Sequence, residues 1–230
     1  MKYEISGDTL PVVTINLNRG ESIYTQSGGM TWMSSEINME TNMKGGLLKG
    51  LGRMLSGESL FMATYTANSD SQFIALASSF PGHIVALDLR AGSFICQKNS
   101  FLCAQPEVSL KTVIPNGLKA GLFGGEGFIM QELSGNGIAF LEIDGSVKEL
   151  ALSAGEKIIV NTGNVAAYES SISFSAQMIK GFKNILFGGE GLFLTTLVGP
   201  GKVYLQSMAL PSFVERIVPF LPKPRNPPSR

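Results

Sequence analysis

The sequence predicts a mainly β protein made of three tandem copies of one β-rich unit, packed with pseudo-threefold symmetry and accompanied by short helical segments. Three observations predict it. The same pattern of strands and turns begins at Gly7, Gly82 and Gly145. Short apolar runs alternate with period two, as in strands that bury one face. The 27 glycines gather in clusters between these runs, which is typical of a chain with many tight turns.

The first half of each unit is a strand, a glycine and an expected hairpin. The strand carries two apolar residues on one face: Ile15 and Leu17, then Leu87 and Leu89, then Leu150 and Leu152. The glycines that follow are Gly20, Gly92 and Gly155. We expect hairpin turns at Ser27-Gly28, Asn99-Ser100 and Thr162-Gly163, because Asn, Gly and Ser suit tight turns.

The second half of each unit repeats more closely. A Gly-Glu pair precedes a strand that opens with bulky apolar residues, at Gly57-Glu58, Gly125-Glu126 and Gly189-Glu190. A turn and a last strand close the unit. A unit this small buries little surface alone, so we expect the three units to pack together. Many short strands with glycine-rich turns suggest a barrel or a two-sheet roll, that is, a β-sandwich.

We therefore divide the chain into unit one (1–81), unit two (82–144), unit three (145–209) and a final segment (210–230). Unit one carries an insertion, 44–55, whose apolar residues fall at helical spacing with basic residues between them. The final segment predicts a short amphipathic helix that starts near Pro211, followed by a proline-rich tail.

Composition narrows the class of protein. Eighteen basic residues balance eighteen acidic ones, so no whole-protein field attracts nucleic acid or anionic lipid. No apolar run reaches the ~20 residues that span a bilayer. Neither a signal-peptide pattern nor a cysteine framework is present, and we expect a cytoplasmic protein.

These motifs resemble a known family, that of the altered inheritance of mitochondria protein 24, also called the mitochondrial biogenesis family. The strongest pieces are SGESLF from Ser56, FPGHIVALDL from Phe80 and GGEGLFLTTLVGPGKVYLQS from Gly188. The resemblance implies three double-stranded β-helix units, each similar to the subunit of the tryptophan RNA-binding attenuation protein (TRAP-like). It implies no established enzymatic activity, and it supplies no catalytic residues. Eukaryotic members are associated with the mitochondrial inner membrane, but this chain lacks a transit peptide and looks prokaryotic.

Three glutamates, Glu58, Glu126 and Glu190, are the candidate metal ligands. A threefold arrangement that brought their carboxylates together would suit a hard cation. We favour the simpler interpretation, in which each glutamate accepts backbone N–H bonds at its own turn. We predict no cofactor.

Cys96 and Cys103 flank the Asn99-Ser100 turn, where a two-residue hairpin would place them opposite one another. That allows a cross-strand redox pair, but two reduced, buried thiols are the better interpretation. His83 is the only histidine, and we expect a surface residue beside a turn. Its being alone excludes a histidine-rich metal site.

We expect a non-enzymatic scaffold or binding protein that forms a homo-oligomer or binds a protein partner. RNA binding is an alternative that rests on fold analogy: Lys119 and Lys183 recur in units two and three, but unit one has Leu51 there. A further alternative is a carboxylate-metal enzyme of the double-stranded β-helix class. Basic residues lie beside an apolar stripe in the segment Lys44–Leu55 and in the C-terminal helix, which is the pattern that peripheral membrane contact requires. The simpler interpretation is that both stripes cover the protein's own core or an oligomer interface.

Overall fold

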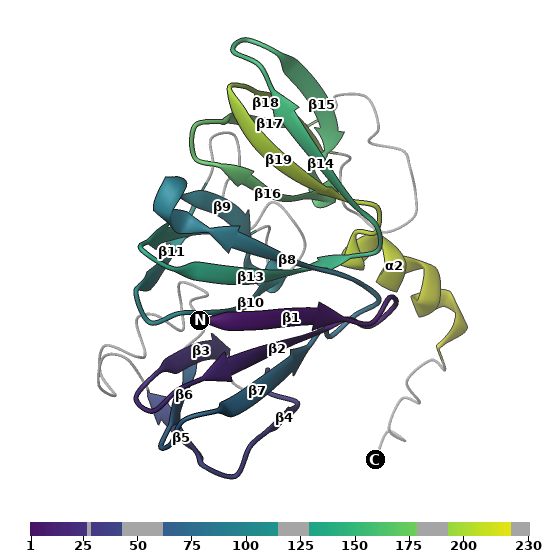
Figure 1. The fold of residues 1–230 in the computed structure, drawn as a ribbon. Coiled ribbons are helices and arrows are strands. Elements are labelled where there is room, and N and C mark those ends of the chain that lie inside the picture. Colours follow the sequence, from purple (N-terminus) through teal and green to yellow (C-terminus); the bar gives the residue numbers. More distant parts are fainter. Residues whose placement is uncertain (27–28, 43–61, 115–128, 179–192, 222–230) are drawn as a thin grey trace, which may run out of the picture.

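The computed structural model describes residues 1–26, 29–42, 62–114, 129–178 and 193–221. The protein is mainly β, which confirms the predicted fold class. Its strands form four antiparallel sheets, called A to D, which lie one above another in a stack (Figure 1). One short helix lies beside the stack near the C-terminus (Figure 1).

Each sheet has a fixed order of neighbouring strands. Sheet A contains β1 (Lys2–Ser6), β2 (Val12–Leu17), β7 (Gln72–Ala77) and β4 (Trp32–Met33). Sheet B contains β5 (Ile37–Asn42), β6 (Met62–Ala67), β3 (Ser22–Gln26), β10 (Phe101–Ala104), β13 (Ile138–Asp144) and β8 (Gly82–Asp88). Sheet C contains β11 (Val108–Val113), β12 (Met130–Gly135), β9 (Phe94–Gln97), β16 (Val165–Glu169), β19 (Gly201–Gln206) and β14 (Val147–Leu152). Sheet D contains β15 (Lys157–Asn161), β18 (Phe193–Val198) and β17 (Ser173–Met178).

Six strands of each unit pair in one scheme, which occurs three times. Counted along the unit, the first strand pairs with the sixth, the third with the sixth, the second with the fifth and the fourth with the fifth. In unit one these pairs are β2·β7, β4·β7, β3·β6 and β5·β6. In unit two they are β8·β13, β10·β13, β9·β12 and β11·β12. In unit three they are β14·β19, β16·β19, β15·β18 and β17·β18.

Consecutive units share a sheet. The third strand of unit two, β10, pairs with β3 of unit one, and β16 of unit three pairs with β9 of unit two. Sheets B and C therefore each hold three strands from one unit and three from the next. Among the described residues, unit three pairs with unit two and not with unit one, so the units run in series and the predicted pseudo-threefold packing is not confirmed. The expected likeness of each unit to the attenuation-protein subunit also stays a prediction.

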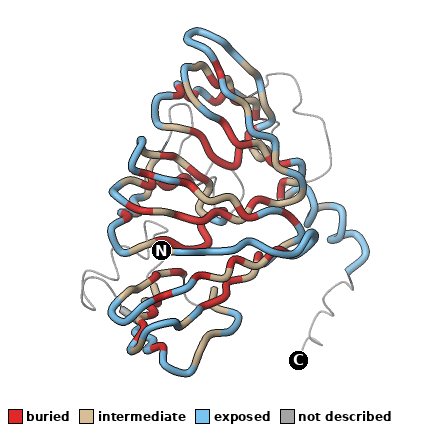
Figure 2. Tube along the Cα trace, in the orientation of Figure 1, coloured by how far each residue is buried: buried red, intermediate tan, exposed pale blue. Residues whose placement is uncertain are grey.

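A hydrophobic core lies between each pair of neighbouring sheets. Representative buried residues are Ile15 and Phe140 between A and B, Cys96 and Leu141 between B and C, and Tyr168 and Leu197 between C and D. The inner sheets are covered on both faces, and all four residues of β10 are accordingly buried. Figure 2 shows buried residues along the middle of the stack and exposed residues on the helix.

The expected hairpins are corners instead, and this prediction is wrong for units two and three. The chain turns through short 3-10 segments, η2 (Lys98–Ser100) and η3 (Thr162–Asn164). In unit two β9 enters sheet C and β10 enters sheet B, so these strands do not pair. The turn residues suit either geometry. The difference arises because β9 pairs with β12 and β16, whereas β10 pairs with β13 and β3, and these partners belong to different sheets. The Ser27-Gly28 turn lies outside the described residues.

The C-terminal helix α2 (Leu210–Ile217) begins near the predicted proline and continues into η4 (Val218–Phe220). The ring of Phe213 packs edge-on against that of Phe80, with centroids 5.3 Å apart. None of the helices in the described part of the chain has the length and apolar character needed to cross a membrane. The predicted helical insertion at 44–55 lies outside the described residues.

Candidate functional site

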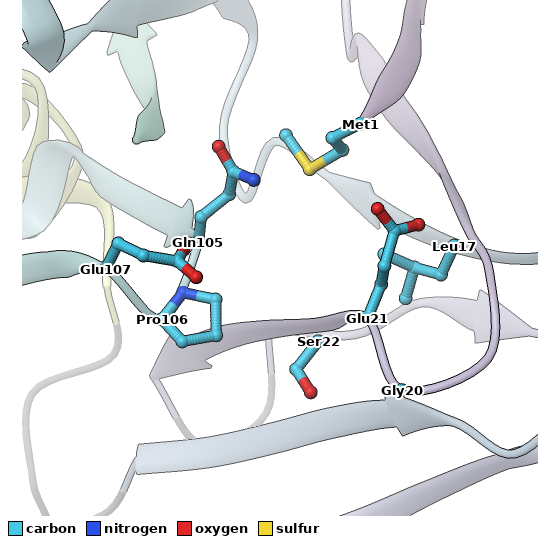
Figure 3. A pocket seen from close by; sticks show the side chains of 8 residues that line it. All are labelled: Met1, Leu17, Gly20, Glu21, Ser22, Gln105, Pro106 and Glu107. Atoms are coloured by element: carbon cyan, nitrogen blue, oxygen red, sulfur yellow. The ribbon is translucent and has the colours of Figure 1, made fainter. Parts of the chain in front are cut away.

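A cavity of about 210 Å³ lies where units one and two meet (Figure 3). Its walls include Glu21 and Ser22 at the start of β3 and Glu107 in the turn before β11. Glu21 Oε2 accepts the backbone N–H of Asn18 at 2.7 Å, and Ser22 Oγ lies 2.8 Å from Thr66 Oγ1. Glu156 Oε2 accepts the N–H of Ser153 in the same way in unit three. Glu21 therefore serves as a turn device of the repeat, which leaves the cavity as a weak candidate for chemistry.

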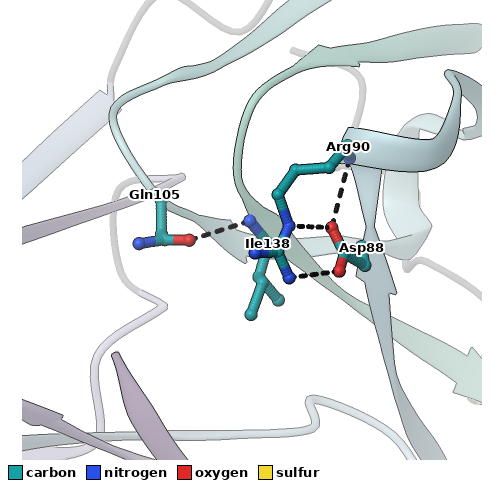
Figure 4. A network of polar contacts seen from close by, with 4 residues as sticks. All are labelled: Asp88, Arg90, Gln105 and Ile138. Atoms are coloured by element: carbon teal, nitrogen blue, oxygen red, sulfur yellow. Dashed lines mark hydrogen bonds and ion pairs between the residues drawn. The ribbon is translucent and has the colours of Figure 1, made fainter.

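Figure 4 shows polar contacts within unit two, made by Asp88, Arg90, Gln105 and Ile138. Arg90 donates from Nε and Nη2 to both carboxylate oxygens of Asp88, and these bonds lower the pKa of Asp88 to about 2. Gln105 Oε1 accepts the N–H of Ile138 at 2.9 Å. Both contacts fix strand ends, and Asp88 and Arg90 are exposed, so the network is structural.

An amide side chain stands at each inner junction. Gln97 at the end of β9 donates from Nε2 to the carbonyls of Gly163 at 3.2 Å and Val165 at 2.6 Å, which belong to unit three. Gln26 at the end of β3 donates to the carbonyl of Lys98 in unit two at 3.5 Å. These bonds join consecutive units by a shared device.

The two end sheets carry strands with an open edge, which we call the terminal edges. Among the described residues, β4 pairs only with β7, and β15 pairs only with β18. The side chain of Trp32 on β4 is 49% exposed, and that of Ile159 on β15 is 69% exposed. In Figure 1 these strands lie at opposite ends of the stack. Large apolar side chains beside unpaired strand edges mark a surface suited to association.

The predicted metal ligands and basic residues are not placed. Glu58, Glu126 and Glu190, together with Lys119 and Lys183, lie outside the described residues. The segments that contain them connect strands that are neighbours in a sheet, since Asn42 is opposite Met62 and Val113 is opposite Met130. Elsewhere in the chain, across the residues that the structure describes, no three His, Cys, Asp or Glu side chains gather to hold a metal.

Cys96 and Cys103 are both buried with free thiols, but they are not hairpin partners. Cys96 in sheet C lies opposite Gln131 and Ala167, whereas Cys103 in sheet B lies opposite Phe140 and Thr25. The expected cross-strand arrangement is therefore wrong, because the turn between them is a corner. Burial raises the pKa of Cys96 to about 12 and that of Cys103 further still. Such thiols are poor nucleophiles at neutral pH.

His83 is exposed near the start of β8, as expected for a surface residue beside a turn. Its Nδ1 donates to the carbonyl of Gly145 at 2.8 Å. The ring thus fastens the boundary between units two and three.

A family model, that of the mitochondrial biogenesis AIM24 family, matches residues 3–208. The chain belongs to this family. This AIM24-family chain is similar to an uncharacterised protein of Streptococcus pyogenes serotype M6, with 33% identity over 225 residues, which cover 94% of this chain and 89% of that protein. The crystal structure of protein SPYM3_0169 from Streptococcus pyogenes superposes with a TM-score of 0.79 at 27% identity, covering 96% of this chain and 99% of that one.

The match confirms the predicted AIM24 family and extends over all three units. The relative's name assigns it no activity. The function of this AIM24-family chain therefore has to be inferred from the chain's own residues. The terminal edges are a feature of the structure that the sequence analysis did not predict. A signal was present in Ile158 and Ile159, because alternation forces one of two adjacent isoleucines in a strand to face outward.

Proposed function

We propose that this chain is a non-enzymatic, oligomeric scaffold of the cytoplasm that acts through its sheet edges. One observation carries the proposal: the stack ends in sheets whose edge strands expose Trp32 and Ile159. Unpaired edge strands template pairing with another chain, and monomeric proteins usually shield them with charge, proline or a covering segment. On β15 only Lys157 provides such a charge.

The uses of the polar groups support a structural role. Glu21, Gln97, Gln105 and His83 each hold a turn, a strand end or a unit boundary through a hydrogen bond to backbone. The buried thiols carry pKa values raised by burial, which suits core residues better than nucleophiles. The chemistry of these groups therefore favours assembly over catalysis.

Native mass spectrometry and sedimentation velocity test this function across micromolar concentrations. We expect species that contain more than one copy, or a copy with a bound protein. Assembly should persist at high salt, because apolar packing and backbone hydrogen bonds are less screened than surface charges. A strict monomer that carries no partner would contradict the proposal.

A further inference from the structure

The two end sheets are complementary halves of the inner sheets. In order, sheets B and C contain the fourth, fifth and second strands of one unit, then the third, sixth and first strands of the next. Sheet D stops after the second strand of unit three, β15, and sheet A begins at the third strand of unit one, β4, with β1 added at the far edge. As far as the described residues show, each end of the stack therefore lacks the half-sheet that the other end presents.

We propose that β15 of one copy pairs antiparallel with β4 of a second copy, so that sheet D of one chain and sheet A of the next become one sheet of the inner type. This inference rests on the proposed function as an oligomeric scaffold and names its partner. The contact is heterologous, which joins copies head to tail. Within one chain β4 and β15 lie at opposite ends of the stack, so the partner is a different copy (Figure 1).

The inner junctions give the register. Cys103 lies opposite Thr25, and Ala167 lies opposite Cys96. Along the chain the spacing between these positions is constant, since Trp32 follows Thr25 by seven positions, as Cys103 follows Cys96 and Ala167 follows Val160. Trp32 therefore occupies the place of Cys103 and Ala167, and Val160 that of Thr25 and Cys96. This equivalence places Trp32 opposite Val160 of the neighbouring copy and Met33 opposite Ile159.

Burial at equivalent positions supports this register. Cys103 and Ala167 are both 0% exposed, because the preceding unit covers them, whereas Trp32 is 49% exposed. The pattern holds for the second strand, where Ile159 is 69% exposed and its equivalents Tyr24 and Ile95 are half-buried.

Tyr24 shows how an inner junction uses this second-strand position. Its ring stacks on Phe101 with centroids 5.6 Å apart, and its hydroxyl donates to the carbonyl of Val108 at 3.0 Å. Both residues belong to unit two. The end residues are therefore exposed where the repeat predicts a neighbouring unit.

The backbone at both edges is oriented for the bond. Gly199 N donates to Glu156 O across the β15–β18 pair. Along an antiparallel strand only every second residue bonds to the same neighbour, and Ile159 is three residues after Glu156, so its N–H points away from β18. Ser34 N donates to Phe73 O, which by the same alternation points the N–H of Met33 away from β7. Within the described residues, the two positions that the register brings opposite one another thus both present backbone groups that no neighbouring strand pairs.

The short length of β4 does not oppose this pairing. It has two residues, and the inner junction between β10 and β3 also consists of two residue pairs. Most of the stabilisation of such a junction comes from apolar side chains that cover the adjoining cores. Trp32 is the largest of these, and aromatic anchors of this kind dominate many interfaces.

Complementation between two variants tests the contact. Trp32→Lys blocks the β4 edge and leaves β15 intact, and Ile159→Lys does the reverse. Each variant alone should be monomeric, with the dissociation constant raised about thirty-fold or more. An equimolar mixture, with one variant isotopically labelled, should give a one-to-one heterodimer by native mass spectrometry. Met39→Lys is the matched control, because Met39 is also 49% exposed but lies on β5, and it should assemble like the wild type.

The outcomes separate this inference from the proposed function. Circular dichroism first establishes that each variant is folded, which the exposure of both side chains predicts. If the wild type assembles and both variants keep its full size, the head-to-tail contact is wrong while the scaffold function stands. If only one variant dissociates and the mixture gives no heterodimer, the contact joins like edges and the inference also fails. A monomeric wild type overturns both.

Discussion

The side-chain amide of Gln97, at the junction of units two and three, should contribute measurably to the stability of the fold. The equivalent amide of Gln26, at the junction of units one and two, should contribute little. The perturbation is Gln97→Leu, which keeps the approximate size of the side chain and removes its polar group. The matched control is Gln26→Leu, since Gln26 ends the equivalent strand and is half-buried like Gln97. Any general effect of leucine at this position appears in both variants.

The magnitude follows from the bonds at each junction. Gln97 donates to two carbonyls, and one of them belongs to Val165, which is 0% exposed. Losing both bonds, and removing this donor from the buried carbonyl of Val165, should lower the free energy of unfolding by about 2–3 kcal/mol. Gln26 makes one bond of 3.5 Å, at the limit of a hydrogen bond, so its loss should cost less than about 1 kcal/mol.

Thermal unfolding followed by circular dichroism measures both effects. For a chain of this size a loss of about 2–3 kcal/mol lowers Tm by roughly 4–12 °C, and Gln26→Leu should lower it by less than about 4 °C. The difference between the two variants is the decisive quantity. Equal shifts, or no shift for Gln97→Leu, would refute the view that this amide fastens unit three to unit two.

Three further predictions concern the core, the thiols and a half-buried carboxyl. Phe140→Ala should cost about 3–5 kcal/mol in urea unfolding, because this ring is fully buried between sheets A and B, and a loss below about 1 kcal/mol would contradict that placement. Cys96 and Cys103 should resist iodoacetamide at pH 8 in the folded chain and react in urea, as followed by mass; rapid labelling of the folded chain would show that they are accessible. Burial, with a smaller contribution from Glu142, raises the pKa of Asp144 from 3.8 to about 6. Between pH about 4 and 6 the folded chain therefore keeps a proton on Asp144 that the unfolded chain has lost, and the free energy of unfolding falls as pH rises through that window. Asp144→Asn should flatten this dependence of stability on pH and stabilise the chain at pH 7 by about 1 kcal/mol. An unchanged dependence on pH would argue against the raised pKa.

Much of the fold follows from local patterns in the sequence. Alternating apolar residues such as Ile15 and Leu17 do lie in a strand with a buried face, and Gly20 and Gly155 take positive φ values of +82° and +77° at the expected turns. The helix after Pro211 was also predictable, because proline favours the first helical turn. These features depend on a few adjacent residues, which the sequence displays directly.

The sharing of sheets could not be predicted in the same way. Whether β9 and β10 form a hairpin depends on partners in other units, and no local pattern reveals that Cys103 lies opposite Thr25. The candidate site was missed for the same reason, since Trp32 is notable only once its equivalents are known to be buried. The three glutamates lie outside the described residues, so both the favoured turn role and the alternative role as metal ligands stay predictions.

Amide hydrogen exchange tests the central claim most directly, namely that each sheet of the stack is completed by the next unit, whether in the same chain or in another. Ile95 and Ile159 hold equivalent positions, one at an inner junction and one at a terminal edge. In the assembled wild type both amides should exchange slowly, and in Trp32→Lys only Ile159 should become fast. Fast exchange at Ile159 in the wild type, or at Ile95 in either protein, would contradict the account.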